Sequence, residues 1–102
     1  MDKKFVQMRI ARIRNAHNVS ARKVSMELGQ STEYINQIEN GKALPSLEGL
    51  FNICDYFNIS LSEFFDDRLE FPVEYKHIID ELNKMDSVAV NQVYELLKLI
   101  NK

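Results

Sequence analysis

Polar side chains with hydrogen-bonding groups crowd one short stretch of this 102-residue chain: Thr32, Glu33, Asn36, Gln37 and Asn40. The strongly apolar residues among them, Ile35 and Ile38, lie three positions apart. If the stretch is helical, this spacing turns both isoleucines toward a core and leaves the polar side chains on the outward face. A carboxamide both donates and accepts hydrogen bonds, so it can pair with the N6 and N7 positions of adenine. The stretch therefore predicts a helix that reads base edges in a DNA groove.

The residues before this stretch predict the helix and the turn that position it. Ser20 can cap a first helix, and Gly29 supplies the left-handed residue that ends it. Ser31 can then cap a second helix, which Gly41 stops. The expected result is a pair of short helices joined by a sharp turn, over about residues 21–40.

Apolar periodicity predicts a further helix before this motif and no strand anywhere in the chain. Val6, Ile10 and Ile13 recur at spacings of four and three, which indicates a helix over residues 3–16. Asn18 tolerates the left-handed conformation just beyond its end. The fold class that follows is all-α.

Two serines mark the helices that complete the first two thirds of the chain. Ser46 can cap a helix with one apolar stripe, made of Leu47, Leu50, Ile53, Cys54 and Phe57. Ser60 and Glu63 have the capping-box pattern of a shorter helix. Five helices are thus expected between residues 3 and 66.

The composition excludes several classes of function. Hydrophobic residues make up 45% of the chain, enough for one small core, and no apolar run approaches a membrane span of about 18 residues. No leader-like segment is evident, so we expect a cytoplasmic protein that binds no membrane. One cysteine and two histidines give no metal-ligand spacing, and Cys54 is typical of a buried small hydrophobe. No paired carboxylates, activated nucleophile or phosphate-binding glycine loop is present, so we expect neither an enzyme nor a cofactor.

Charge is distributed unevenly along the chain. Residues 1–45 carry eight basic and four acidic residues, whereas the remainder carries five basic and eleven acidic ones. The positive first part suits a modest surface that faces phosphates. The overall net charge of -2 disfavours tight non-specific binding to DNA.

Several short motifs stand in a characteristic order. They are the first helix pattern ending in Arg14, the Leu28-Gly29 helix end, the run INQIENGK at 35–42, PSL at 45–47 and ISLSEFF at 59–65. In this order and spacing, the chain resembles the Cro and phage-repressor type of helix-turn-helix family, often called Xre, over about residues 6–65. The resemblance implies a five-helix, lambda-repressor-like DNA-binding domain over residues 1–69, with the motif at about 21–40.

The resemblance also implies roles for individual residues. The start of the second motif helix enters the major groove in this family, so base contacts are expected from Thr32, Glu33, Asn36 and Gln37. Contacts to the DNA backbone are expected from Arg22, Lys23, Ser31, Tyr34, Asn40 and Lys42. A structural role for Tyr34 and ordinary solvated surface for Lys23 are the alternatives. Arg14 and Glu39 occupy the positions of an ion pair between the first and third helices.

Two positions depart from the family pattern. Ala21 stands where a glutamine usually contacts a phosphate, so Arg22 or Gln30 would have to compensate. Ser25 replaces the usual alanine at the crossing of the two motif helices, and it is small enough to fit.

Residues 70–102 lie outside the resemblance and predict a C-terminal helical hairpin. Pro72 suits the first turn of one helix, whose apolar stripe comprises Tyr75, Ile78, Ile79, Leu82 and Met85. Asp86 can start a second helix, whose apolar positions are Val90, Val93, Leu96, Leu97 and Ile100. This is more apolar surface than the hairpin covers alone. It could pack on the domain or receive another protein, but we expect it to form the interface of a homodimer.

Two functions from different classes fit these patterns. The first is a sequence-specific transcriptional regulator, most simply a repressor that binds a palindromic operator in double-stranded DNA as a homodimer. The second is a protein-interaction module, such as an antitoxin, that keeps the fold with weak or no DNA binding. The amide-rich helix face and the basic first part favour the regulator.

Overall fold

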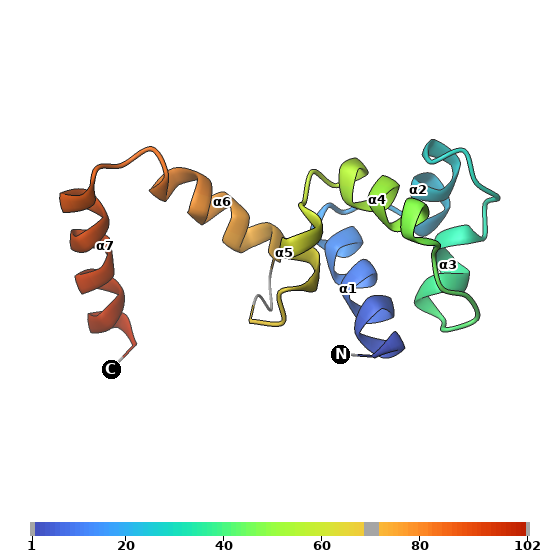
Figure 1. Cartoon of the computed structure of the whole chain (residues 1–102), viewed down its shortest axis with the longest axis horizontal. Helices are drawn as coiled ribbons and strands as arrows, with labels where there is room; N and C mark the ends of the chain where they lie inside the picture. Colours follow the sequence, from blue (N-terminus) through green and yellow to red (C-terminus); the bar gives the residue numbers. More distant parts are fainter. Residues whose placement is uncertain (1, 69–71, 102) are drawn as a thin grey trace.

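The computed structural model describes residues 2–68 and 72–101, leaving aside the side chain of Pro72. These residues form seven α-helices and no strand (Figure 1). The helices are α1 (Lys3–Ala16), α2 (Ala21–Glu27), α3 (Tyr34–Glu39), α4 (Leu47–Tyr56), α5 (Leu61–Phe65), α6 (Pro72–Leu82) and α7 (Ser87–Ile100). The predicted all-α class is confirmed, and α1 has the predicted bounds.

Helices α1 to α5 enclose one hydrophobic core. Each of them contributes at least one fully buried side chain, from the set Ile10, Ile13, Val24, Ile35, Ile38, Ile53 and Phe64. Both isoleucines of α3 are 0% exposed, as their spacing predicts. A helix of six residues is too short to be stable alone, whereas burying one isoleucine contributes about 1.5 to 3 kcal/mol. The core therefore holds α3 by its apolar side and leaves its polar side outward.

Four helices end on a residue in the left-handed conformation: Asn18 after α1 (φ 54°), Gly29 after α2 (φ 74°), Gly41 after α3 (φ 78°) and Asn58 after α4 (φ 53°). After α2, the N–H of Gln30 donates to the carbonyl of Ser25, and the N–H of Gly29 donates to that of Met26. This pair of bonds defines a Schellman motif. The predicted left-handed residues Asn18 and Gly29 are confirmed, and Gly29 makes the turn before α3 sharp.

Replacing Gly29 with alanine is expected to lower the free energy of unfolding by about 1 kcal/mol. No neighbouring heavy atom lies within 4 Å of the position that a Cβ would take, so the cost comes from the backbone at positive φ alone. Urea unfolding measures the change. Gly29→Asn should cost less, because asparagine tolerates this conformation. Identical midpoints for wild type and Gly29→Ala would contradict the assignment.

The predicted caps of α4 and α5 are confirmed, but the predicted position of one apolar residue of α4 is not. Ser46 Oγ accepts the N–H of Gly49 at 3.0 Å, and Ser60 and Glu63 form the predicted capping box of α5. The prediction that Leu47 belongs to the core-facing stripe is wrong, since this residue is 64% exposed. Leu47 is the first residue of α4, and a helical side chain leans toward the N-terminus, so it extends past the core.

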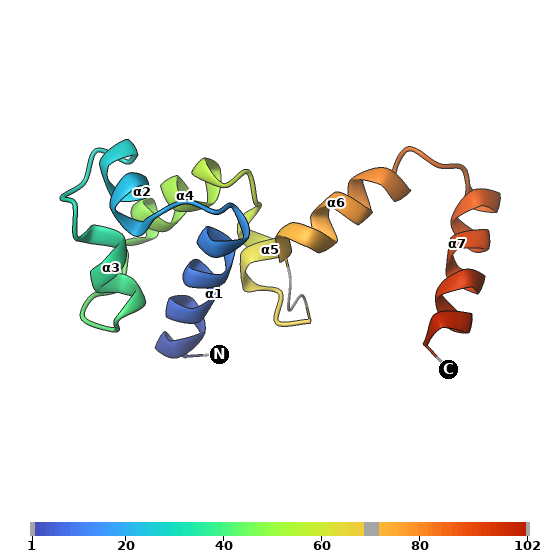
Figure 2. The ribbon, with the colours of Figure 1, turned by 180° about the vertical axis from the view of Figure 1, so that it is seen from behind.

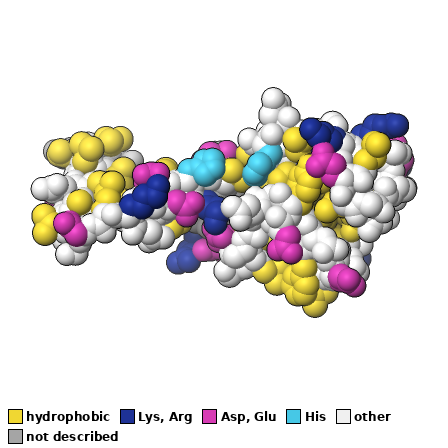
Figure 3. Space-filling model, turned by 90° about the horizontal axis from the view of Figure 1, so that it is seen from above, with side chains coloured by type: hydrophobic (Ala, Val, Ile, Leu, Met, Phe, Trp, Pro, Cys, Tyr) yellow, Lys and Arg dark blue, Asp and Glu magenta, His cyan; other side chains and the backbone are white. Residues whose placement is uncertain are grey.

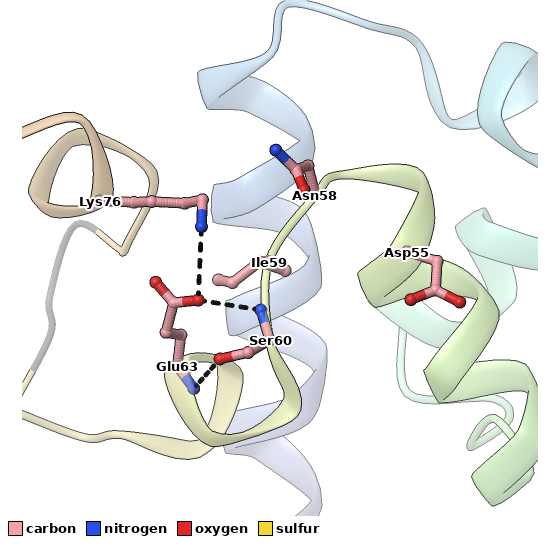
Figure 4. Close-up of a pocket in the computed structure, with 6 residues that line it drawn as sticks. All are labelled: Asp55, Asn58, Ile59, Ser60, Glu63 and Lys76. Carbon is pink, nitrogen blue, oxygen red and sulfur yellow. Dashed lines mark hydrogen bonds and ion pairs between the residues drawn. The ribbon is translucent and has the colours of Figure 1, made fainter. Parts of the chain in front are cut away.

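The first turns of α6 pack against the five-helix core. Val73 is 8% exposed, and the Nζ of Lys76 lies 3.7 Å from Oε1 of Glu63 in α5. Figure 4 shows these two side chains meeting beside a pocket, where Glu63 also accepts the N–H of Ser60 at 3.0 Å. Burial opposes the charge on Glu63, but the Ser60 hydrogen bonds and Lys76 outweigh it, so the pKa of Glu63 is lowered.

Beyond this attachment, α6 and α7 project from the core as an arm. The described residues extend over 49 × 25 × 23 Å with a radius of gyration of 16.2 Å, whereas a compact chain of this length has about 13 Å. Asp86 caps α7 through the N–H of Ala89, as predicted. The two helices expected as a hairpin are both present. They open away from their connection, however, instead of lying side by side (Figure 1 and Figure 2).

Candidate nucleic-acid interface

The motif helices α2 and α3 lie at the end of the molecule opposite the arm (Figure 1). Helix α3 begins at Tyr34, later than the predicted start at Ser31. The predicted side-chain cap by Ser31 is wrong. Ser31 accepts the Tyr34 N–H through its backbone carbonyl at 3.1 Å, which forms a turn, and Glu33 is the N-cap residue without making a side-chain cap.

The start of α3 is bonded to α2 instead. Ser25, which is fully buried, accepts the N–H of Ile35 at 3.0 Å and donates its hydroxyl proton to the carbonyl of Ala21 at 2.7 Å. The sequence indicated only that a small residue fits at this crossing. No local pattern shows that a serine of one helix bonds the start of the next, so this contact was missed.

The four residues predicted to contact bases lie together at the start of α3 and in the turn before it. Glu33, Asn36 and Gln37 are exposed, and Thr32 is half-buried. Nδ2 of Asn36 lies 3.4 Å from Oε2 of Glu33, so the carboxylate can orient the amide. This surface presents hydrogen-bond donors and acceptors from a helix whose other side is fixed in the core.

Arg14 of α1 and Glu39 at the end of α3 form a bidentate ion pair. The Nε atom of Arg14 lies 2.7 Å from Oε2, and Nη2 lies 2.8 Å from Oε1. A third donor, Nη1, bonds the carbonyl of Val19 at 2.8 Å. The two charged side chains are only 17% and 12% exposed, and the hydrogen bonds to Glu39 raise the pKa of Arg14. The pair ties the end of α3 to α1 and to the segment that enters α2.

Only part of the positive charge in residues 1–45 faces outward. Arg9 is 6% exposed; its Nη2 donates to the carbonyl of Asp66 at 3.0 Å, and its guanidinium carbon lies 4.8 Å from the centre of the Phe5 ring. Burial lowers the pKa of Arg9. The residues that remain exposed around the motif include most of the predicted backbone contacts, namely Arg22, Lys23, Ser31, Asn40 and Lys42.

Tyr34 differs from the other predicted backbone contacts because it packs against α4. A Cβ added to Gly49 would lie 2.6 Å from the Tyr34 hydroxyl oxygen, so the hydroxyl reaches the first turn of α4. Burial raises the pKa of Tyr34. These contacts support the structural role, in which Tyr34 spaces α3 from α4.

The arm exposes a large apolar surface. Val90 and Val93 are half-buried, but Leu96, Leu97 and Ile100 are 57%, 47% and 69% exposed. No residue of α7 is buried. Hydrophobic side chains are prominent at the arm end of the molecule in Figure 3. Contiguous apolar surface of this kind is typical of a protein interface.

Groups suited to other chemistry are scarce in the described part of the chain. There, no cluster of three or more His, Cys, Asp or Glu residues is arranged to hold a metal ion. No helix in residues 2–68 or 72–101 has the length and apolar character needed to span a membrane. Cys54 is buried, and burial raises the pKa of its thiol to about 11, which favours the packing role over a nucleophilic one.

Comparison with known proteins extends these observations. Over 95 residues the chain is 28% identical to the cryptic phage CTXphi transcriptional repressor RstR of Vibrio cholerae serotype O1 (strain ATCC 39315 / El Tor Inaba N16961), a match that covers 88% of this chain and 84% of that protein. No solved structure gives a significant match. A family model described as Helix-turn-helix, HTH_3, matches residues 10–64, which include α2, α3 and the turn between them. The chain therefore belongs to the HTH_3, or Xre-type, helix-turn-helix family, whose members are DNA-binding transcriptional regulators and not enzymes.

Proposed function

We propose that this protein is a sequence-specific transcriptional repressor that binds a palindromic operator as a homodimer. The observation that carries the proposal is the polar face of α3, where Asn36 and Gln37 are exposed on a helix anchored at both ends and along its apolar side. The similarity to the repressor RstR supports repression over activation. The repressor acts in the cytoplasm and needs no cofactor.

In this proposal the start of α3 enters the major groove. Gln37 pairs with N6 and N7 of adenine, and Asn36 reads a neighbouring base. Thr32 contacts a thymine methyl group, and Glu33 accepts from cytosine N4 or orients Asn36. Contacts to phosphates, which set the register on the duplex, come from Arg22, Lys23, Ser31, Asn40 and Lys42.

The arm joins two chains, so that a second recognition helix is available for the second half-site of the operator. One short recognition helix reads few bases, so a two-fold dimer with half-sites about one helical turn, roughly 34 Å, apart is the simplest specific reader. Along α7, Val90, Val93, Leu97 and Ile100 recur at spacings of three, four and three, which suits interlocking helices, and Leu96 extends the same surface.

The charges on α7 do not oppose association of two copies. Glu95 and Lys98 pair within the helix at 3.1 Å, so their charges largely cancel. Residues 1–69 are then the DNA-binding part, and residues 70–102 are the association part. A chain that stays monomeric in sedimentation at tens of micromolar would instead favour another protein as the partner of the arm.

Selection from a randomised duplex library at near-physiological salt tests the proposed function. The full chain is expected to enrich a palindrome, and a parallel selection with Gln37→Ala should change or lose one base in each half-site. DNA that is retained only at low salt, with no enriched sequence, would contradict sequence-specific binding. That result would favour the protein-interaction alternative.

Gln37→Ala is expected to weaken binding to the selected operator by about tenfold or more, because one bidentate base contact provides about 1 to 3 kcal/mol of discrimination. Affinity for scrambled DNA should not change, since glutamine carries no charge to contribute to phosphate attraction. Competition binding measures both affinities. The matched control is Gln92→Ala, which removes an exposed glutamine from α7. Equal operator affinities for the two variants would contradict the assignment of Gln37.

A further inference from the structure

A buried hydroxyl joins the two helices of the motif. Ser25 is 0% exposed, and its Oγ lies 2.7 Å from the carbonyl oxygen of Ala21 and 3.0 Å from the backbone nitrogen of Ile35. A carbonyl only accepts and a backbone N–H only donates, so the direction of both bonds is fixed. The single hydroxyl proton goes to Ala21, and the oxygen accepts from Ile35. Linked bonds of this kind polarise and strengthen one another in a low-dielectric interior.

Helix α3 depends on this hydroxyl because its own start provides no side-chain cap. The first N–H groups of an α-helix have no acceptor within the helix. In α3 the Tyr34 N–H uses the Ser31 carbonyl, Glu33 makes no side-chain cap, and the Ile35 N–H uses Ser25. The cap of this helix therefore comes from the preceding helix. Such a bond keeps its short length only within a narrow range of separation and rotation between α2 and α3.

We propose that Ser25 is a positioning residue for DNA reading, which sets the depth and rotation at which α3 presents Asn36 and Gln37. The inference rests on the proposed function of α3. The ion pair of Arg14 holds the opposite end of the helix at Glu39. Without the Ser25 hydroxyl, the start of α3 keeps the packing of Tyr34 and Ile35 but loses its hydrogen bond to α2. Asn36 and Gln37, which follow Ile35 directly in the chain, are then the residues that shift.

Ser25→Ala in the full chain tests this role, because it removes the oxygen and leaves the Ile35 N–H buried without an acceptor. We expect about a tenfold fall in the ratio of operator affinity to scrambled-DNA affinity, and about tenfold faster amide exchange at Ile35. Ser25→Cys refills the volume with a thiol that hydrogen-bonds weakly, so it should restore neither value.

Ser60→Ala is the matched control, because Ser60 also accepts a backbone N–H at 3.0 Å but caps α5, outside the motif. It should lower stability and leave the affinity ratio at the wild-type value. The positioning role would be overturned if amide exchange at Ile35 is unchanged in Ser25→Ala. It would also be overturned if exchange is faster but the affinity ratio stays at the wild-type value. If the wild type binds both duplexes with equal affinity, the proposed function and the positioning role of Ser25 are both refuted. Amide exchange at Ile35 still tests, independently of DNA, whether the Ser25 hydroxyl protects that N–H.

Discussion

Replacing Arg14 with alanine is expected to lower the free energy of unfolding by about 3 kcal/mol, and operator binding should be lost with the fold as temperature rises. The change removes two hydrogen bonds to Glu39 and one to the carbonyl of Val19. It also leaves the Glu39 carboxylate, which is 12% exposed, without its partner. Breaking a fully buried pair costs about 3 to 5 kcal/mol, and the remaining exposure of this pair places the expected loss at the lower end.

Arg68→Ala is the control for this prediction. Arg68 also pairs with a carboxylate, that of Asp66, at 2.8 Å, but its side chain is 86% exposed, so its loss should leave the melting temperature close to that of the wild type. Arg14→Lys keeps the charge but not the bidentate geometry and should fall between the two. Thermal unfolding followed by circular dichroism measures all three. If Arg14→Ala has the same melting temperature as the wild type, the ion pair does not anchor α3.

Leu97→Glu is expected to convert the proposed dimer to a monomer and to weaken operator binding by at least about a hundredfold. A carboxylate without a partner is costly to bury in an apolar interface. Joining two DNA-binding units makes the second contact intramolecular, which raises affinity by about 10² to 10⁴. Leu97 is 47% exposed within one chain, so the substitution should not unfold the protein.

The control for the arm is Asn91→Asp, which adds the same charge at an exposed position on the side of α7 opposite Val93, Leu96 and Ile100. This variant should remain dimeric with wild-type operator affinity. Sedimentation equilibrium and DNA titration provide the two measurements. A dimeric Leu97→Glu that binds operator like the wild type would contradict the assignment of the interface to this face of α7.

Helix ends were predictable where all the contacts of a cap lie close together in the sequence. Ser60 and Glu63 satisfy each other across three residues, so the pattern and the structure coincide. Gly29 and Asn18 end their helices for a similarly local reason, since the conformation after the last turn selects the residue type. These local signals predicted where most helices of the five-helix core begin or end.

Predictions that depended on distant contacts were less successful. Ser31 has the residue type of a cap, but the hydroxyl of Ser25 in the preceding helix takes that role for α3. Arg9 counted as part of a positive surface, yet it is buried against the carbonyl of Asp66, far along the chain. Spacing also did not reveal the pair between Arg14 and Glu39, which came from the family resemblance.

The arm shows what periodicity leaves open. The apolar spacing predicted α6 and α7, but in one chain much of both apolar stripes is exposed: Ile78 and Ile79 of α6 are 55% and 42% exposed, and no residue of α7 is buried. Periodicity does not say which partner covers a face, because that depends on the apolar surfaces within reach. In one chain α7 finds little surface to bury against, so the expected hairpin is open.

Whether α3 reads a DNA sequence is tested most directly by the affinities of the full chain for its selected operator and for a scrambled duplex of equal length, at near-physiological salt. We expect the operator to bind at least about a thousandfold more tightly. Equal affinities that fall together as salt is raised would contradict sequence reading, because attraction to phosphates alone behaves in this way.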